Sequence, residues 1–174
     1  VFNRPKCEDI IKINTWPRTM ERCYSWRDFE VFHGEDKIAI ATSKWVLVNT
    51  ETGRIERVSE ELKEKYKLKE ECVFEEEIIE KTKEPEEMEL MYEDIVGRTR
   101  MDTNNHLNNV YYLDYAIETL PEEVYENNTF NNIEIMYKKE IKYKEKIKYL
   151  YKYENNEHKV AIKREDLKTL HAIV

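Results

Sequence analysis

The stretch DTNNHLNNVYYLDYAIETL, residues 102–120, decides the fold of this chain. Its aliphatic residues recur at helical spacing as far as Pro121, and they are Leu107, Val110, Leu113, Ile117 and Leu120. An Asn or Asp before such a run is typical of a helix N-cap, so the pattern predicts a helix that begins within residues 102–109. The first-turn N–H groups and the positive end of the helix dipole would then face whatever lies beside His106.

The polar half of this stretch allows two interpretations from the residues alone. In the first, Asp102, Asn104 and His106 form a reactive site, in which the helix N-terminus stabilises negative charge that develops on a substrate oxygen. In the second, Asp102 or Asn104 only caps the helix, and His106 hydrogen-bonds to a neighbouring group.

The residues after this helix predict antiparallel strands. Apolar and aromatic residues alternate with polar ones at Ile133, Ile135, Tyr137, Ile141, Ile147, Tyr149, Tyr151 and Tyr153. A turn at residues 154–157 leads into a further strand at 158–163, and residues 90–96 would lead into the helix. A long helix followed by hairpins that can wrap it indicates an α+β fold. A ferredoxin-like arrangement would need a second crossover helix, which residues 131–163 do not offer.

The N-terminal part of the chain predicts another hairpin. Residues 23–32 and 37–49 are rich in β-branched and aromatic residues, and residues 33–36 form the turn between them. Ser59 precedes two glutamates, which predicts a short helix that ends near Tyr66. The two hairpins together indicate a tandem duplication.

A charge-dense segment separates the two parts, and we expect it to contribute one strand near residues 73–79. The expected organisation is therefore a first half at residues 1–70, a connector at 71–87 and a second half at 88–174.

Several motifs resemble those of one known family. The pattern Asp102-x-Asn104-x-His106-x-x-Asn109, followed by Val110-Tyr111 and preceded by Arg98 and Arg100, resembles the signature of acyl-ACP thioesterases. The segment Tyr137-Lys138-Lys139-Glu140 is similar to the family's Tyr-Arg-Arg-Glu segment. Three upstream segments, at residues 15–17, 27–30 and 41–46, resemble strand motifs of the family's first half. The resemblance spans nearly the whole chain.

This resemblance implies a fold and an activity. The fold would be an α+β tandem (double) hotdog, in which each antiparallel sheet wraps a long helix. By comparison with the family, we expect the first half to lack its N-terminal helix in this sequence. The activity would be hydrolysis of the thioester of fatty acyl-ACP to free fatty acid and holo-ACP, which ends chain elongation. The rivals are an acyl-CoA thioesterase of the hotdog class and a non-catalytic acyl-binding hotdog module.

The resemblance also assigns site residues by position. The catalytic residues would be Asp102, Asn104, His106 and Glu140, and the substrate-binding residues Arg98, Asn108, Asn109 and Tyr111. Glu140 would be the general base on water, alone or with His106, while Asn104 and the helix N-terminus hold the thioester oxygen and Asp102 orients the group. Strand alternation alone places Glu140 on a solvated face, so a bulge or a pocket must bring it to His106. Some members have a Cys after this Glu, but Ile141 here favours attack by water.

The overall charge of the chain limits which partners are expected. A net charge of -8 argues against nucleic-acid binding. Acyl carrier protein, the partner that the resemblance implies, is itself acidic, so docking needs a basic patch. Candidates are Lys138, Lys139, Lys142, Lys144, Lys146 and Lys148, which could equally form a solvated face that protects a sheet edge.

The cysteines and the hydropathy pattern exclude several classes of protein. Cys7, Cys23 and Cys72 lack CxxC spacing, which indicates neither a disulfide framework nor a zinc site and favours the cytoplasm. We expect no cofactor and no metal. We also expect neither secretion nor membrane insertion, because the chain shows no leader and no apolar run of membrane-spanning length. A monomer or a homodimer is expected, since a double hotdog pairs its halves internally.

Overall fold

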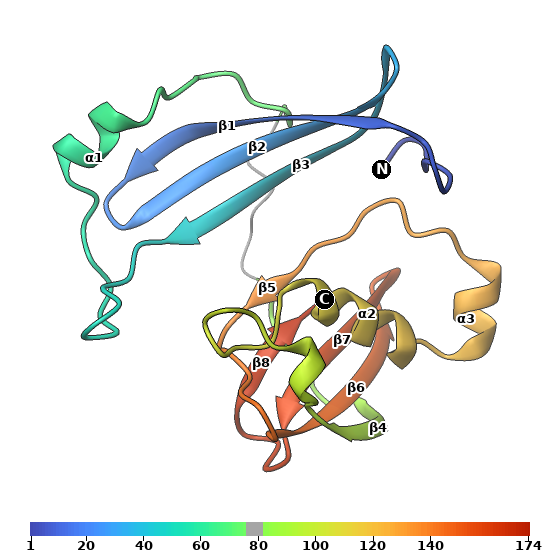
Figure 1. Cartoon of the computed structure of the whole chain (residues 1–174). Helices are drawn as coiled ribbons and strands as arrows, with labels where there is room; N and C mark the ends of the chain where they lie inside the picture. The colour runs from blue at the N-terminus through green and yellow to red at the C-terminus, as the bar shows by residue number, and fades with distance from the viewer. Residues whose placement is uncertain (76–81) are drawn as a thin grey trace. The chain divides into compact units, whose positions relative to one another are not determined.

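The computed structural model of the chain describes residues 1–75 and 82–174 (Figure 1). The chain forms two compact units, Val1–Glu80 and Lys81–Val174, and each contains one antiparallel sheet. Of the strand expected near residues 73–79, residues 73–75 form bends, and the remainder lies outside the described residues. The boundaries expected for the two halves and the connector remain predictions.

The sheet of the first unit is a three-stranded meander. Its strands are β1 (Ile11–Glu21), β2 (Tyr24–His33) and β3 (Asp36–Val46), paired in the order β1-β2-β3. Figure 1 shows these strands as long, twisted ribbons. The predicted hairpin at residues 33–36 is confirmed, and Gly34 takes a φ of 61° at its turn, a conformation that glycine adopts without strain.

The short helix of this unit follows the predicted cap. Helix α1 spans Glu60–Lys65, and the Ser59 side chain accepts a hydrogen bond of 3.1 Å from the Leu62 N–H. The two glutamates of its first turn favour the positive end of the helix dipole. The prediction for this segment is confirmed.

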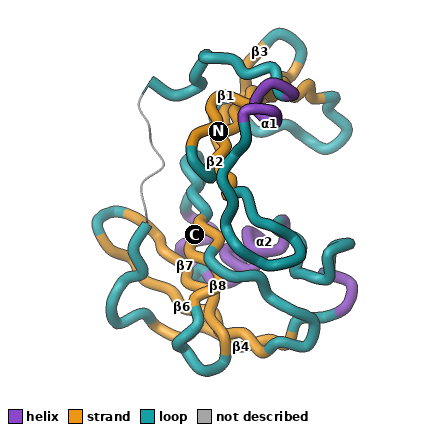
Figure 2. Tube along the Cα trace, turned by 90° about the vertical axis from the view of Figure 1, so that its left-hand side faces the viewer, coloured by secondary structure: helices purple, strands orange, loops and turns teal. Residues whose placement is uncertain are grey.

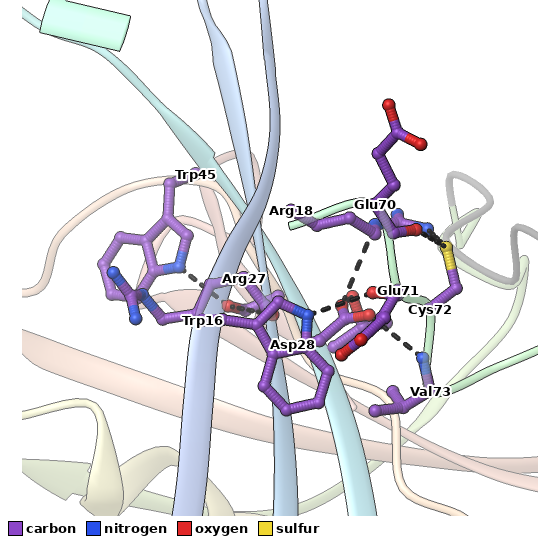
Figure 3. A network of polar contacts seen from close by, with 11 residues as sticks. Trp16, Arg18, Arg27, Asp28, Trp45, Glu70, Glu71, Cys72 and Val73 are labelled. Atoms are coloured by element: carbon purple, nitrogen blue, oxygen red, sulfur yellow. Dashed lines mark hydrogen bonds and ion pairs between the residues drawn. The ribbon is translucent and has the colours of Figure 1, made fainter. Parts of the chain in front are cut away.

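A buried carboxylate fixes the segment after α1 along the sheet (Figure 3). Asp28 is 1% exposed, and it accepts hydrogen bonds from the Thr42 hydroxyl at 2.7 Å and from the Val73 N–H at 3.1 Å. The indole N–H of Trp16 donates to the Glu71 carbonyl at 3.0 Å. These bonds satisfy buried polar groups of the sheet and hold residues 71–73 against it.

The second unit contains a five-stranded antiparallel sheet and one long helix. In the order β4-β6-β7-β8-β5, its strands are β4 (Glu89–Ile95), β6 (Lys146–Glu154), β7 (Glu157–Arg164), β8 (Leu170–Ile173) and β5 (Met136–Tyr137). Helix α2 (Val110–Thr119) packs on β6 and β7, as Figure 2 also shows. Two shorter helices, η1 (Arg98–Arg100) and α3 (Glu122–Asn127), were not predicted.

Tyrosine rings build much of the core between helix and sheet. The buried face of α2 consists of Tyr112, Tyr115, Ala116 and Thr119. Tyr149 on β6 is fully buried, with its ring 4.9 Å from that of Tyr115 and 4.1 Å from that of Tyr92. The aliphatic spacing predicted a helix here, and the structure has one, although Val110 is 67% exposed and Ile117 is 38% exposed.

The strand expected over residues 131–141 is largely wrong. Only Met136–Tyr137 pairs, with Ile173 and Ala172 of β8, and Ile133 upstream is half exposed. The hairpin of β6 and β7 is confirmed. Its turn residues Asn155 and Asn156 both have positive φ, as the two-residue turns that suit antiparallel strands require.

Candidate active site

The polar run at residues 102–108 forms a tight turn that its first carboxylate organises. Asp102 Oδ1 accepts hydrogen bonds from the Asn104 N–H at 2.8 Å and from the His106 N–H at 3.0 Å. The Asp102 N–H donates to the His106 carbonyl at 2.8 Å, and Asn105 takes a φ of 61°. The His106 N–H, followed by that of Asn104, holds the pKa of the Asp102 carboxyl below its ordinary value.

The helix begins after this turn, which corrects the prediction that it begins within residues 102–109. Helix α2 starts at Val110 with Asn109 as its N-cap residue. The side-chain oxygen of Asp102 binds N–H groups of the turn, so it acts on the loop and not on a helix end. The N-terminus of α2 therefore lies further along the chain than the sequence pattern indicated.

Buried contacts anchor the turn on both sides. Leu107 is 2% exposed, and its N–H donates to the Ile141 carbonyl at 2.9 Å. Isolated β-bridges join Met101 to Leu107 and His106 to Lys142. Upstream, the Arg100 carbonyl accepts the Asn108 N–H, at 3.0 Å. The backbone around His106 is thus tied to the loop that follows β5.

The structure brings His106 and Glu140 together. Nε2 of His106 lies 3.9 Å from Oε1 of Glu140, and the two side chains are 39% and 49% exposed. Glu140 lies in a loop rather than in a strand, because β5 ends at Tyr137. The bridge between His106 and Lys142, rather than a bulge, brings the two side chains close. The distance exceeds a direct hydrogen bond, as is common for catalytic pairs without substrate.

The other two predicted catalytic residues lie on the same turn as His106. Asp102 holds the turn through its carboxylate, and Asn104 is exposed beside it. Ile141, next to Glu140, is fully buried in the core of the second unit. A thiol nucleophile at that position is excluded by residue type, and the side chain that stands there faces the core.

The predicted substrate-binding residues have varied surroundings. Asn108 Oδ1 accepts the Val110 N–H at 3.2 Å and so supports the start of α2, while the Asn109 carbonyl accepts the Tyr137 hydroxyl at 3.3 Å. Tyr111 packs half-buried against the core. Arg98 is exposed, and its guanidinium lies 5.2 Å from the centre of the Tyr143 ring and donates to the Tyr143 hydroxyl at 3.5 Å.

Two arginine contacts near the turn were not predicted from the sequence. The Arg100 guanidinium bonds to the Asp94 carboxylate at 2.8 Å and to the Tyr115 hydroxyl. The Arg98 guanidinium holds the pKa of the Tyr143 hydroxyl below its ordinary value. Arg100 and Asp94 are six residues apart on different elements, and Arg98 and Tyr143 are 45 residues apart, so no helix or strand spacing indicates either pairing.

The predicted basic patch divides into two sets of lysines. Lys146 pairs with Glu165 at 3.0 Å, and Lys148 pairs with Glu93 at 3.1 Å. Lys138, Lys139, Lys142 and Lys144 are exposed and flank Glu140 along its loop. The positive charge that could meet an acidic partner is therefore concentrated beside the candidate site.

Metal sites, membrane-spanning helices and the state of the cysteines can also be checked in the described residues. Within residues 1–75 and 82–174, no group of three or more His, Cys, Asp or Glu side chains could hold a metal ion. In the same part of the chain, no helix is both long and apolar enough to span a membrane. Cys7, Cys23 and Cys72 are free thiols.

Comparisons with known sequence families agree with the motifs. A family model described as the acyl-ACP thioesterase N-terminal domain matches residues 1–66, and one described as the acyl-ACP thioesterase C-terminal domain matches residues 80–174. The chain is 28% identical over 151 residues to an oleoyl-acyl carrier protein thioesterase of Coriandrum sativum, and 29% identical over 157 residues to oleoyl-acyl carrier protein thioesterase 2 of Arabidopsis thaliana. Each alignment covers 80% of this chain and 41% of the plant protein.

Solved structures show the same fold. The chain resembles a 12:0-ACP thioesterase from Umbellularia californica, with a TM-score of 0.78 and 18% identity. It also resembles an acyl-ACP thioesterase from Bacteroides thetaiotaomicron, with a TM-score of 0.74 and 19% identity. Each match covers 94% of this chain and 66% of the other. These likenesses confirm the predicted α+β, hotdog-type fold.

Proposed function

We propose that this chain, which belongs to the acyl-ACP thioesterase family, hydrolyses the thioester of fatty acyl-ACP to free fatty acid and holo-ACP, ending chain elongation. The observation that carries the proposal is the pairing of His106 and Glu140, 3.9 Å apart, beside the turn that Asp102 organises. The imidazole and the carboxylate come from separate segments and are both accessible to solvent. A packing role does not require this arrangement.

In the proposed reaction, water is the nucleophile. Glu140, with His106 beside it, takes a proton from water as the oxygen adds to the thioester carbon. The carbonyl electrons move onto the oxygen, and the exposed Asn104 amide donates a hydrogen bond to that oxyanion. The oxyanion then re-forms the carbonyl and expels the thiolate, which receives the proton that the pair has held. Asp102 orients the turn through its two backbone hydrogen bonds.

The carrier protein is the proposed partner. Lys138, Lys139, Lys142 and Lys144 lie exposed around Glu140, where positive charge would attract an acidic carrier to the site. Arg98, whose guanidinium lies over Tyr143 between Lys142 and Lys144, adds to this charge. We keep Asn108, Asn109 and Tyr111 as proposed substrate contacts, although Asn108 also supports the start of α2. A monomer or homodimer, and a cytoplasmic location supported by the three free thiols, remain part of the proposal.

A substrate panel tests the proposed function. Purified protein is assayed for thiol release from acyl-ACPs of several chain lengths and from the matching acyl-CoAs, with Asp102→Asn and Glu140→Gln as folded variants. Glu122→Gln, on the exposed start of α3, is the matched control for loss of a carboxylate. We expect turnover on acyl-ACP that both site variants lose and the control keeps.

The other outcomes distinguish the rival functions. Equal rates on acyl-CoA would indicate the hotdog acyl-CoA thioesterase instead. Binding of acyl chains without any turnover would indicate a non-catalytic acyl-binding module, and it would overturn the hydrolase proposal.

A further inference from the structure

We propose that His171, a buried residue of β8, is a positioning residue that holds the loop of residues 138–145 so that Glu140 meets His106. This inference rests on the proposed function, because Glu140 is the group whose placement it explains. No motif in the sequence indicates His171, which lies far from the polar turn in the chain. The side chain is 0% exposed, and burying an imidazole costs free energy unless the ring has polar partners.

His171 contacts the peptide unit that precedes Glu140 from two directions. Its backbone carbonyl accepts the Lys138 N–H at 2.8 Å and the Lys139 N–H at 3.2 Å. Its ring Nδ1 lies 3.1 Å from the Lys139 carbonyl oxygen. Both polar backbone groups of Lys139 are therefore fixed by one residue, immediately before the proposed catalytic carboxylate.

A carboxylate lies between the other ring nitrogen and the far side of the same loop. Nε2 of His171 lies 3.4 Å from Oε1 of Glu145, a contact that is not a hydrogen bond. Glu145 accepts the Lys142 N–H at 2.9 Å and the Arg164 Nε–H at 2.6 Å. The loop is thus held before Glu140 by His171 directly and after it by Glu145, with Arg164 of β7 pairing that carboxylate at the rim.

The chemistry of the imidazole suits this role. Nδ1 lies within hydrogen-bond distance of the Lys139 carbonyl and acts as the donor in that contact, while Nε2 lies beside the Glu145 carboxylate without a hydrogen bond. An aliphatic side chain of similar size would leave the Lys139 carbonyl without this donor. The loop would then be held to β8 only by the Lys138 and Lys139 N–H bonds to the backbone carbonyl of residue 171.

Loss of this support acts on turnover more than on binding. The His106–Glu140 distance is already 3.9 Å, so a shift of the loop by about 1 Å takes the pair out of reach and costs about 100-fold in rate. The exposed lysines move with the loop, but a shift of about 1 Å is small against the roughly 8 Å range over which their charge attracts the carrier. We therefore expect His171→Leu to lower kcat about 100-fold while KM changes by less than about threefold.

The test combines kinetics with amide exchange in the whole protein. His171→Asn keeps a donor near Nδ1 and should recover most of the lost kcat. His158→Asn is the matched control, because His158 on β7 contacts Tyr151, Tyr153 and Phe130 and not this loop. Hydrogen exchange of the Lys138, Lys139 and Lys142 amides should be about tenfold faster in the Leu variant and unchanged in the control.

The outcomes separate this inference from the proposed function. Unchanged exchange in the loop of a folded His171→Leu variant overturns the inference, whatever the rate of hydrolysis. If His171→Asn loses as much kcat as His171→Leu, the inference is overturned as well. If wild-type protein released no thiol, the proposed function would fail, and faster exchange of the loop amides would still support the structural part of the inference. If His171→Leu does not fold, Arg164→Gln tests the same network from its exposed rim, with faster exchange at Lys142 expected.

Discussion

Replacing Glu140 by glutamine should separate catalysis from stability, because the structure assigns the two effects very different sizes. Two unit charges 4 Å apart interact by about 1 kcal/mol in water, and measured exposed pairs give about 0.2–1 kcal/mol. His106 and Glu140 are each more than one third exposed, so their pairing adds at most about 1 kcal/mol to folding. General-base catalysis supplies about 100-fold to 10,000-fold in rate, which corresponds to about 2.7–5.4 kcal/mol of barrier.

The assay is a double-mutant cycle that uses Glu140→Gln, His106→Gln and the double variant. Thiol release gives kcat, and thermal melts followed by circular dichroism give stability. We expect each single variant to lose at least about 100-fold in kcat, and the double variant to lose little more than the worse single one, because the two groups act as a unit. The reasoning is refuted if Glu140→Gln keeps its rate within about threefold, or if its loss of rate is matched by an equal loss of folding free energy.

Two further predictions concern charges away from the reacting pair. Burial raises the pKa of Glu145, but the Lys142 N–H and Arg164 outweigh it and hold the pKa below the ordinary 4.5. The stability that wild type gains over Glu145→Gln should therefore be present above about pH 4.5 and vanish in acid melts as the pH falls through the folded pKa. In the first unit, Thr42→Val leaves buried Asp28 without a hydroxyl donor and should cost about 1.5–3 kcal/mol by denaturant unfolding, whereas Thr42→Ser should cost less; equal stability of the two variants would contradict this.

The parts of the fold that local chemistry determines could be predicted from the sequence. The cap at Ser59, the turn after His33 and the hairpin turn at Asn155 and Asn156 each depend on residues adjacent in the chain. Such signals are complete within a few residues, since they rest on capping side chains and on backbone conformations that Gly and Asn tolerate.

The errors arose where tertiary contacts overrode a local pattern. Leu107 fits the helical spacing of the following run, yet its burial and its bond to Ile141 place it in a loop before α2. Tyr115 and Thr119 lie in the core although they carry polar atoms, because their hydroxyls find partners inside the unit. The alternation of apolar and polar residues from Ile133 to Ile141 predicted one strand, but within this segment only Met136 and Tyr137 pair with β8.

In the candidate site too, some features could be predicted from the sequence and others depend on tertiary contacts. The residue types at positions 102, 104, 106 and 140 could be identified from the resemblance, and the meeting of His106 with Glu140 is found in the structure. The anchoring contacts of Arg100 and His171 could not be predicted, since each partner lies on another element and has no fixed spacing from the motif.

The attachment of the Glu140 loop to β8 has a consequence for how the protein is made. Synthesis proceeds from the N-terminus, and a ribosome delivers the motif turn and the Glu140 loop well before it delivers β8. Until β8 has emerged and paired, Lys138 and Lys139 have no His171 carbonyl to bind, and the proposed general base is not held in place. A nascent chain of this protein is therefore expected to be inert toward thioesters until β8 has left the ribosome and joined the sheet.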